Sequence, residues 1–179
     1  MTSMTDFHSK RITMTYRAAP TRPGWAIFAL IIGFTVLAAL IGSVASINAA
    51  EFYQGLVKPS WAPPAWVFGP VWTIMFVMMA ASAWLVVKGR ALSRSRPELT
   101  LYGAQLVLNA AWTWLFFHWH LGAVAFIEVL ILLLLVVLTA RAFHRVKPLA
   151  GWLLAPYIAW VSFAGLLTYS VWQGNPAVL

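Results

Sequence analysis

Five long apolar stretches constrain this chain more than any other feature of its sequence. They cover residues 25–47, 67–87, 99–119, 121–140 and 149–172, and each is close to the roughly 20 residues that a helix needs to cross a bilayer. Charged residues make up only 9% of the chain, against about 25% in a typical soluble domain. Polar side chains therefore cannot cover a water-facing surface, and lipid is the expected solvent for most of the chain.

These stretches predict helices. Backbone polar groups in lipid must find partners inside the protein, which leaves helices and closed barrels as spanning structures. The alternating segments of about ten residues that build a barrel are absent. We predict an all-α integral membrane bundle of five transmembrane helices, with a basic polar tail at residues 1–24 and a short C-terminal tail at residues 175–179. Pro156 should kink the fifth helix or free a carbonyl near Trp152, because proline has no N–H to donate.

The net charge of +8 fits a membrane orientation better than nucleic-acid binding. If the helices alternate in direction, one side carries eleven basic residues and the other carries only Lys58. The eleven are Lys10, Arg11, Arg17, Arg22, Lys88, Arg90, Arg94, Arg96, Arg141, Arg145 and Lys147. In a bacterial cell membrane this asymmetry places the N-terminus in the cytoplasm and the first loop outside. In an organelle or an outer membrane the charge difference between the two sides would remain, but the sides would face other compartments.

The first 24 residues have two interpretations. They are polar and basic, as in a disordered cytoplasmic tail. They also carry Arg and Thr with almost no acid, as in a mitochondrial-type targeting segment.

The loop after the first apolar stretch is rich in proline and tryptophan. Residues that precede a proline are pushed towards extended geometry, so residues 58–64 should not continue a helix. We expect a stiff aromatic cap outside the apolar layer, which leads into a helix near Trp66.

Polar side chains inside the apolar stretches are candidates for contact with a ligand or a neighbouring helix. Gln105, Asn109 and Trp112 share one helical face, and amides in membrane helices turn inward towards another helix or a ligand. Glu128 is the one acidic residue within the five stretches. It is either a neutral acid bonded to a neighbouring helix or a proton relay.

Aromatic and small side chains recur at helical spacing. Trp72 and Phe76 form one aromatic pair, and Tyr157, Trp160 and Ala164 follow one face of the fifth helix. Such stripes suit both packing and a ligand wall. Small residues four apart allow helices to approach closely, within one protomer or between two. They are Ala38, Gly42 and Ser46 in the first helix, and Gly151, Ala155 and Ala159 in the fifth.

Catalytic and metal-binding patterns are missing from the sequence. It has no cysteine, no phosphate-binding glycine loop, no HExxH and no nucleophile elbow. His118 and His120 are two apart and do not face each other on a helix, so an interfacial position is favoured over a metal pair. We therefore predict no catalytic residue, no metal site and no required cofactor.

Three motifs resemble the signature of the TspO/MBR family, the tryptophan-rich sensory proteins that include the translocator proteins. They are KPSWAPPAWVFGPVWT at residues 58–73, AQLVLNAAW at residues 104–112 with two phenylalanines at 116–117, and PYIAWVSFA at residues 156–164. The resemblance covers residues 25–174 and leaves the basic N-terminal extension outside. It implies a five-helix membrane bundle, commonly a homodimer, that binds porphyrins, sterols and synthetic aromatic ligands under the first loop.

The resemblance also implies site residues. Its ligand-binding positions fall on Tyr53, Trp72, Phe76, Asn109, Trp160 and Ala164, and its lid loop falls on Lys58, Pro59, Trp61, Pro63 and Pro64. Translocator proteins close a sterol-recognition motif with a basic residue, but Gln173 stands at that place here, so cholesterol is not predicted.

We therefore expect a membrane receptor, sensor or transporter-like protein for porphyrins and related aromatic ligands. Lys58, the lone cation on its side, is the candidate partner of the ligand's carboxylates. One alternative is an enzyme that breaks down porphyrin photo-oxidatively, with tryptophans taking part. The other is a small proton-coupled exporter that uses Glu128.

Overall fold

The structure is a computed structural model, and it describes residues 24–89 and 92–179. The basic tail predicted for residues 1–24 lies almost wholly outside this part of the chain, so its two interpretations stay open.

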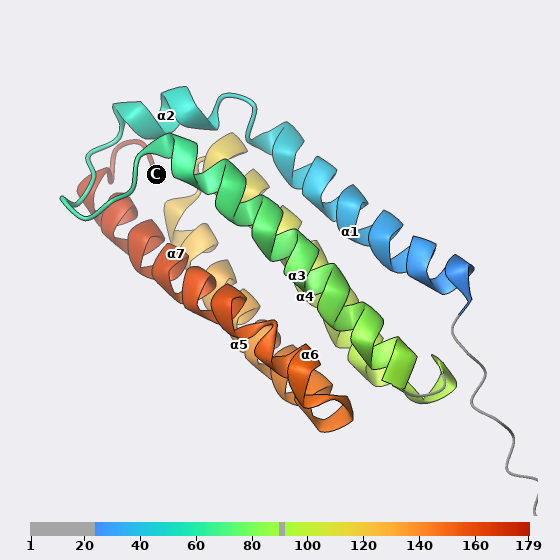
Figure 1. The fold of residues 1–179 in the computed structure, drawn as a ribbon. Helices are drawn as coiled ribbons and strands as arrows, with labels where there is room; N and C mark the ends of the chain where they lie inside the picture. The colour runs from blue at the N-terminus through green and yellow to red at the C-terminus, as the bar shows by residue number, and fades with distance from the viewer. Residues whose placement is uncertain (1–23, 90–91) are drawn as a thin grey trace, which may run out of the picture.

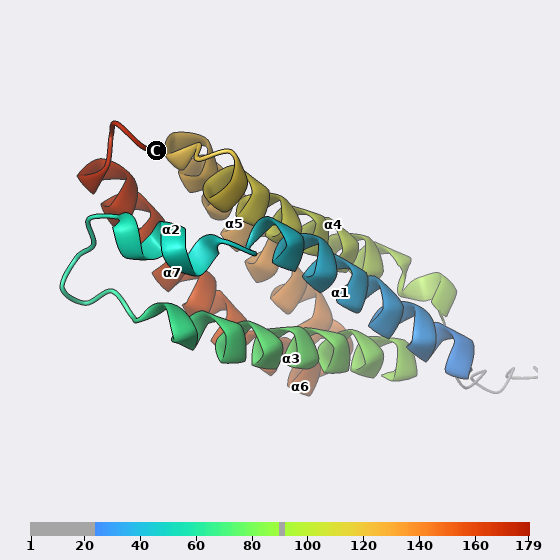
Figure 2. The ribbon, with the colours of Figure 1, turned by 90° about the horizontal axis from the view of Figure 1, so that it is seen from above.

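Long helices lie side by side and give an all-α bundle, as predicted (Figures 1 and 2). The elements are α1 (Trp25–Ala45), α2 (Ala49–Gly55), η1 (Ala65–Val67), α3 (Phe68–Gly89), η2 (Leu92–Arg94), α4 (Arg96–Thr113), η3 (Trp114–His118), α5 (Gly122–Val146), α6 (Pro148–Trp152) and α7 (Ala155–Gly174). By length and composition, α1, η1 with α3, α5, and α6 with α7 are apolar enough to cross a membrane. The shorter and more polar α4 completes the bundle by packing between α1 and α5.

The helix α5 is the centre of the packing. It contacts α4, α6 and α7, while α1 contacts α3 and α4. Side chains such as Leu106, Val136 and Phe143 are fully buried where these helices meet. A second apolar cluster, which includes Phe116 and Val171, lies under α2.

Two glycines explain how closely the helices approach. A Cβ atom on Gly42 would lie 3.2 Å from Thr113 Oγ1, and one on Gly151 would lie 2.5 Å from His144 Cβ. Gly42 therefore lets α1 sit against α4, and Gly151 lets α6 sit against α5. At these two positions the small residues serve contacts within one protomer, which the spacing alone left open.

The fifth apolar stretch is interrupted, as its proline predicted. The helix α6 ends at Trp152 and α7 begins at Ala155, with Pro156 in the first turn of α7. Proline is well tolerated there because the first N–H groups of a helix have no partner within it.

Two helices end elsewhere than the sequence suggested. The charges at residues 141–147 suggested a loop, but α5 continues to Val146 and only Lys147 separates it from α6. Basic side chains such as Arg145 are favourable in the last turn of a helix, so they do not terminate it. The third predicted helix divides into α4 and the π-helical segment η3, which ends in a tight turn where His120 has a φ of 54°.

The two ends of the bundle differ. Figure 1 shows α2, the first loop and the C-terminus at one end, and the start of α1 and the α3–α4 and α5–α6 junctions at the other. Among the described residues, Lys88, Arg94, Arg96, Arg141, Arg145 and Lys147 lie at or near these junctions, whereas Lys58 lies at the α2 end. The elements thus keep the charge asymmetry that the sequence predicted.

Candidate functional site

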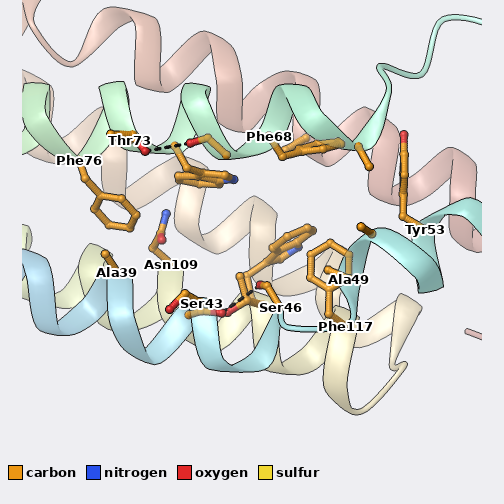
Figure 3. Close-up of a pocket in the computed structure, with 18 of the residues that line it drawn as sticks. Ala39, Ser43, Ser46, Ala49, Tyr53, Phe68, Thr73, Phe76, Asn109 and Phe117 are labelled. Carbon is orange, nitrogen blue, oxygen red and sulfur yellow. Dashed lines mark hydrogen bonds between the residues drawn. The ribbon is translucent and has the colours of Figure 1, made fainter.

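A cavity of about 460 Å³ lies under α2, between α1, α3, α4 and α7. This volume falls in the range of about 300–1,000 Å³ that is usual for small-molecule sites. Figure 3 shows its length: Phe76 and Asn109 lie at one end, and Tyr53 lies at the other, on α2.

All six residues named by the family resemblance line this one cavity. They are Tyr53 from α2, Trp72 and Phe76 from α3, Asn109 from α4, and Trp160 and Ala164 from α7. The fold thus collects side chains that are more than 100 residues apart in the sequence. That a ligand binds there stays a prediction.

Aromatic rings form much of the cavity wall. Trp72 and Phe76 are tilted against each other with ring centroids 5.8 Å apart, and Trp160 meets Phe68 edge-on at 5.9 Å. Rings held in this way present broad apolar surface and lose little freedom on binding a flat ligand.

Asn109 contributes an amide to the wall, and a hydrogen bond to a residue outside the cavity fixes its position. Its Nδ2 donates to the Tyr157 hydroxyl at 2.8 Å, and Tyr157 is fully buried on α7. The Tyr157 ring also lies edge-on to Trp72, with centroids 6.2 Å apart. One buried tyrosine therefore supports two residues of the cavity. Gln105 shares a helical face with Asn109 but is fully buried and does not line the cavity; its Nε2 lies 3.5 Å from Met79 Sδ.

Sequence reasoning left three aromatic wall residues out of the site. Phe68, Trp112 and Phe117 also line the cavity. Trp112 shares a helical face with Asn109, which was a usable signal, and it stacks on Phe116 with an interplanar angle of 7°. Phe117 belongs to η3, where a π-helical turn changes the direction of successive side chains, and apolar periodicity does not predict such a turn.

The exposed lining residues indicate where the cavity opens. Ser43 on α1, Ala50 on α2, and Gly69 and Thr73 on α3 line the cavity and are exposed. Figure 3 shows Ser43 and Thr73 on the two facing helices. The opening therefore lies between α1 and α3, on a surface that faces lipid in a membrane.

The predicted lid residues Lys58, Pro59, Trp61, Pro63 and Pro64 do not line the cavity; they belong to the loop outside it. The Trp61 ring, about half exposed, packs edge-on against Phe163 of α7 at 5.7 Å. The five loop residues do not form the wall of the cavity, and their role as a lid stays a prediction.

Lys58 ties the loop to α2. Its ammonium donates to the carbonyls of Tyr53, Gln54 and Leu56, at 2.7, 3.1 and 2.8 Å. An ammonium has three donors, and the last carbonyls of a helix attract a cation. Lys58 thus bonds to the end of α2, and its role as the partner of ligand carboxylates stays a prediction.

Tyr53 fastens the other end of the loop. Its hydroxyl donates to the Pro63 carbonyl at 3.1 Å, and its ring meets Phe68 edge-on at 5.4 Å. Burial raises the pKa of the Tyr53 hydroxyl above its ordinary value of 10.0, so the hydroxyl keeps the proton that it donates.

A third fastening comes from the C-terminal end of α7 and was not predicted. The Asn175 side chain accepts a hydrogen bond from the Val57 N–H at 2.9 Å and donates to the Val57 carbonyl at 2.9 Å. Its amide also donates to the Val171 carbonyl at 2.7 Å. We call the two hydrogen bonds between Asn175 and Val57 the Asn175 latch. It joins the first loop to the last helix across 118 residues of sequence.

Glu128 lies outside the cavity. It is 7% exposed on α5, and within the described part of the chain neither of its carboxyl oxygens has a hydrogen-bond partner. The sequence left two alternatives for Glu128, a hydrogen bond to a neighbouring helix and a proton relay. Among the described residues, the structure shows no hydrogen-bond partner for either role.

The two histidines near the α4–α5 turn contact aromatic rings. His120 stacks on Phe52 of α2 with centroids 4.2 Å apart, and His118 meets Trp114 edge-on at 4.9 Å. Across residues 24–89 and 92–179, no three or more His, Asp or Glu side chains gather as a possible metal site.

Comparison with known proteins places this bundle in a family. The profile of the TspO/MBR family matches residues 12–173, so it begins within the N-terminal segment that the motif resemblance left outside. The tryptophan-rich protein TspO of Chlorobaculum tepidum is 39% identical over 150 residues, which cover 83% of this chain and 95% of that protein. The translocator protein of Bos taurus is 37% identical (80% and 89% covered), and the tryptophan-rich sensory protein of Cereibacter sphaeroides is 33% identical (84% and 92% covered).

These matches agree with the architecture. The chain is a multi-pass membrane bundle, three of its segments carry the family motifs, and its relatives are covered over most of their length. They support a membrane receptor or sensor role. The chain belongs to the TspO/MBR family of integral membrane proteins.

Proposed function

We propose that this protein is a membrane receptor or sensor that binds a porphyrin or a related flat aromatic ligand in the cavity under α2. The observation that supports this most is the composition of the wall, where Trp72, Phe76, Trp112 and Trp160 meet from three helices around a single amide. A tetrapyrrole has a large flat apolar face that such rings can contact on both sides.

The ligand's carboxylates need a place outside the apolar wall. With Lys58 bound to the end of α2, the carboxylates would reach water or lipid headgroups through the opening between α1 and α3. This arrangement requires an amphiphilic ligand: an aromatic body for the cavity and polar groups for its mouth.

The two alternatives receive less support from the geometry. An exporter coupled through Glu128 would place that carboxyl on the substrate path, but Glu128 does not line the cavity. Photo-oxidative breakdown would use the indoles beside the ligand, and the experiment below tests for it through its products.

Assembly and orientation are separate proposals. We propose a homodimer on the family resemblance alone. We propose a cell membrane as the location, with the N-terminus cytoplasmic, on the asymmetry of the basic residues between the two ends of the bundle.

The test is a titration with protoporphyrin in detergent, in which binding is measured by the quenching of tryptophan fluorescence. The titration is done in the dark and in light, and the products are analysed in both cases. Trp72→Ala and Trp160→Ala should each weaken binding by about 2- to 13-fold, the scale of 0.5–1.5 kcal/mol per aromatic contact beyond area burial. Asn109→Leu should change the order of preference among ligands, and Lys58→Ala should matter least.

Trp152→Ala is the matched control, because Trp152 is 68% exposed on α6 and lies outside the cavity. If the two wall variants fold by circular dichroism and bind like the parent, the cavity is not the porphyrin site. Products that form only in light would add porphyrin breakdown to the binding role.

A further inference from the structure

Tyr157 lies behind the cavity wall and contacts Asn109, the amide side chain in that wall. It is fully buried and does not line the cavity, yet its hydroxyl accepts the 2.8 Å hydrogen bond from Asn109 Nδ2. Its ring supports Trp72 edge-on at 6.2 Å. A ligand in the cavity would thus meet Asn109 and Trp72 in positions that Tyr157 holds.

The Asn109–Tyr157 hydrogen bond decides which end of the amide a ligand meets. An asparagine side chain has an oxygen that accepts and a nitrogen that donates. Nδ2 donates to Tyr157, and the Asn109 oxygen accepts no hydrogen bond from another described residue. The oxygen is therefore the end that can accept a hydrogen bond from a ligand in the cavity, where Asn109 lies beside Phe76 (Figure 3). In an apolar site a polar atom without a partner is costly, so the ligand is selected by what it offers to that oxygen.

We propose that Tyr157 is a positioning residue that sets ligand preference, because it presents the Asn109 oxygen to the cavity and favours aromatic ligands with an N–H or O–H donor at that point. The inference rests on the proposed function, since it assumes that the cavity binds an aromatic ligand. It adds a chemical criterion, a hydrogen-bond donor on the ring edge, that neither the family resemblance nor the shape of the cavity supplies.

Three tricyclic probes of nearly equal shape can test this preference. Carbazole carries an N–H donor, fluorenone carries a carbonyl acceptor, and fluorene carries neither. Their affinities for the whole protein in detergent can be compared by displacement of bound protoporphyrin. The parent should bind carbazole about 2- to 13-fold more tightly than fluorene, the scale of one net hydrogen bond, and fluorenone no better than fluorene.

Tyr157→Phe is the informative variant. It keeps the ring against Trp72 and removes the hydroxyl, so the amide can turn and the ratio of carbazole to fluorene affinity should fall towards one. Tyr102→Phe is the matched control, because Tyr102 is another buried tyrosine whose hydroxyl bonds a side chain, Thr35 Oγ1 at 2.6 Å, outside the cavity. A loss of stability alone would lower all affinities together and leave the ratio unchanged.

The outcomes separate this inference from the proposed function. If protoporphyrin and all three probes fail to bind the parent, the proposed function is wrong. If they bind but fluorenone is preferred to carbazole, or Tyr157→Phe keeps the parent's ratio, only the role of Tyr157 is refuted. In an Asn109→Leu background the hydroxyl should no longer affect the ratio, and a persistent effect would also refute the mechanism.

Discussion

Replacing Asn175 with alanine should loosen the first loop while leaving the bundle intact. The change removes both hydrogen bonds to Val57 that make up the Asn175 latch, and each is worth about 0.5–1.5 kcal/mol net. The closed loop should therefore lose about 1–3 kcal/mol relative to an open one, which raises the open population about 5- to 150-fold. Bundle contacts of α5 do not involve the latch, so global unfolding should change much less.

Hydrogen–deuterium exchange of the backbone, read by mass spectrometry in a lipid nanodisc, measures this effect directly. Exchange should rise over residues 56–67 in Asn175→Ala and stay unchanged in the centre of α5. Exchange of the loop in Asn175→Asp should lie between that of the parent and that of Asn175→Ala, because aspartate keeps the acceptor for the Val57 N–H and loses the donor to the Val57 carbonyl. Asn48→Ala is the control, since Asn48 precedes α2 and its side chain makes no capping hydrogen bond.

Loop exchange in Asn175→Ala that stays at the parent's level would contradict this prediction. In that case Lys58 and Tyr53 hold the loop without the latch. The prediction fails equally if exchange rises throughout α5, because the latch would then stabilise the whole bundle rather than the loop.

Three further predictions concern a tight helix contact, the orientation in the membrane and the role of Glu128. Gly151→Ala should lower the melting temperature sharply in a thermal-shift assay, because its Cβ would meet His144 at 2.5 Å and the Ala140 carbonyl at 2.9 Å; Ala155→Ser, at a half-buried position on α7, should change it little. Cysteines introduced at the exposed Ser60 and Ser93 should react with an impermeant thiol reagent from opposite sides of the membrane, and equal labelling on intact cells would contradict the orientation. Glu128→Gln should bind protoporphyrin with the parent's pH dependence, whereas a changed dependence would favour the proton relay.

The sequence was sufficient to predict the long helices, and the six residues implied by the family resemblance line one cavity. Apolar length predicted the spanning elements because lipid leaves few alternatives to a helix, and Pro156 marked the break between α6 and α7. Trp72 and Trp160 could be assigned to one site only through the family motifs, because stripes of rings serve packing as readily as binding.

The fastening of the first loop could not be predicted. Lys58 looked like a free cation because its charge is isolated in the sequence, yet its partners are backbone carbonyls, which every residue carries. Asn175 reaches Val57 across 118 residues, and no local pattern announces such a pair. Ends of helices were misplaced for a similar reason, since charged residues at 141–147 continue α5 as readily as they form a loop.

The central claim, that an aromatic ligand occupies the cavity under α2, is tested most directly by filling that cavity. Ala164 lines it, whereas Ala159 lies on the same helix and is exposed to the surroundings. In a protoporphyrin titration, Ala164→Phe should weaken binding by about 5- to 150-fold, the scale of a steric penalty of 1–3 kcal/mol, and Ala159→Phe should bind like the parent. Equal binding by the two variants, both folded by circular dichroism, would show that the ligand binds elsewhere.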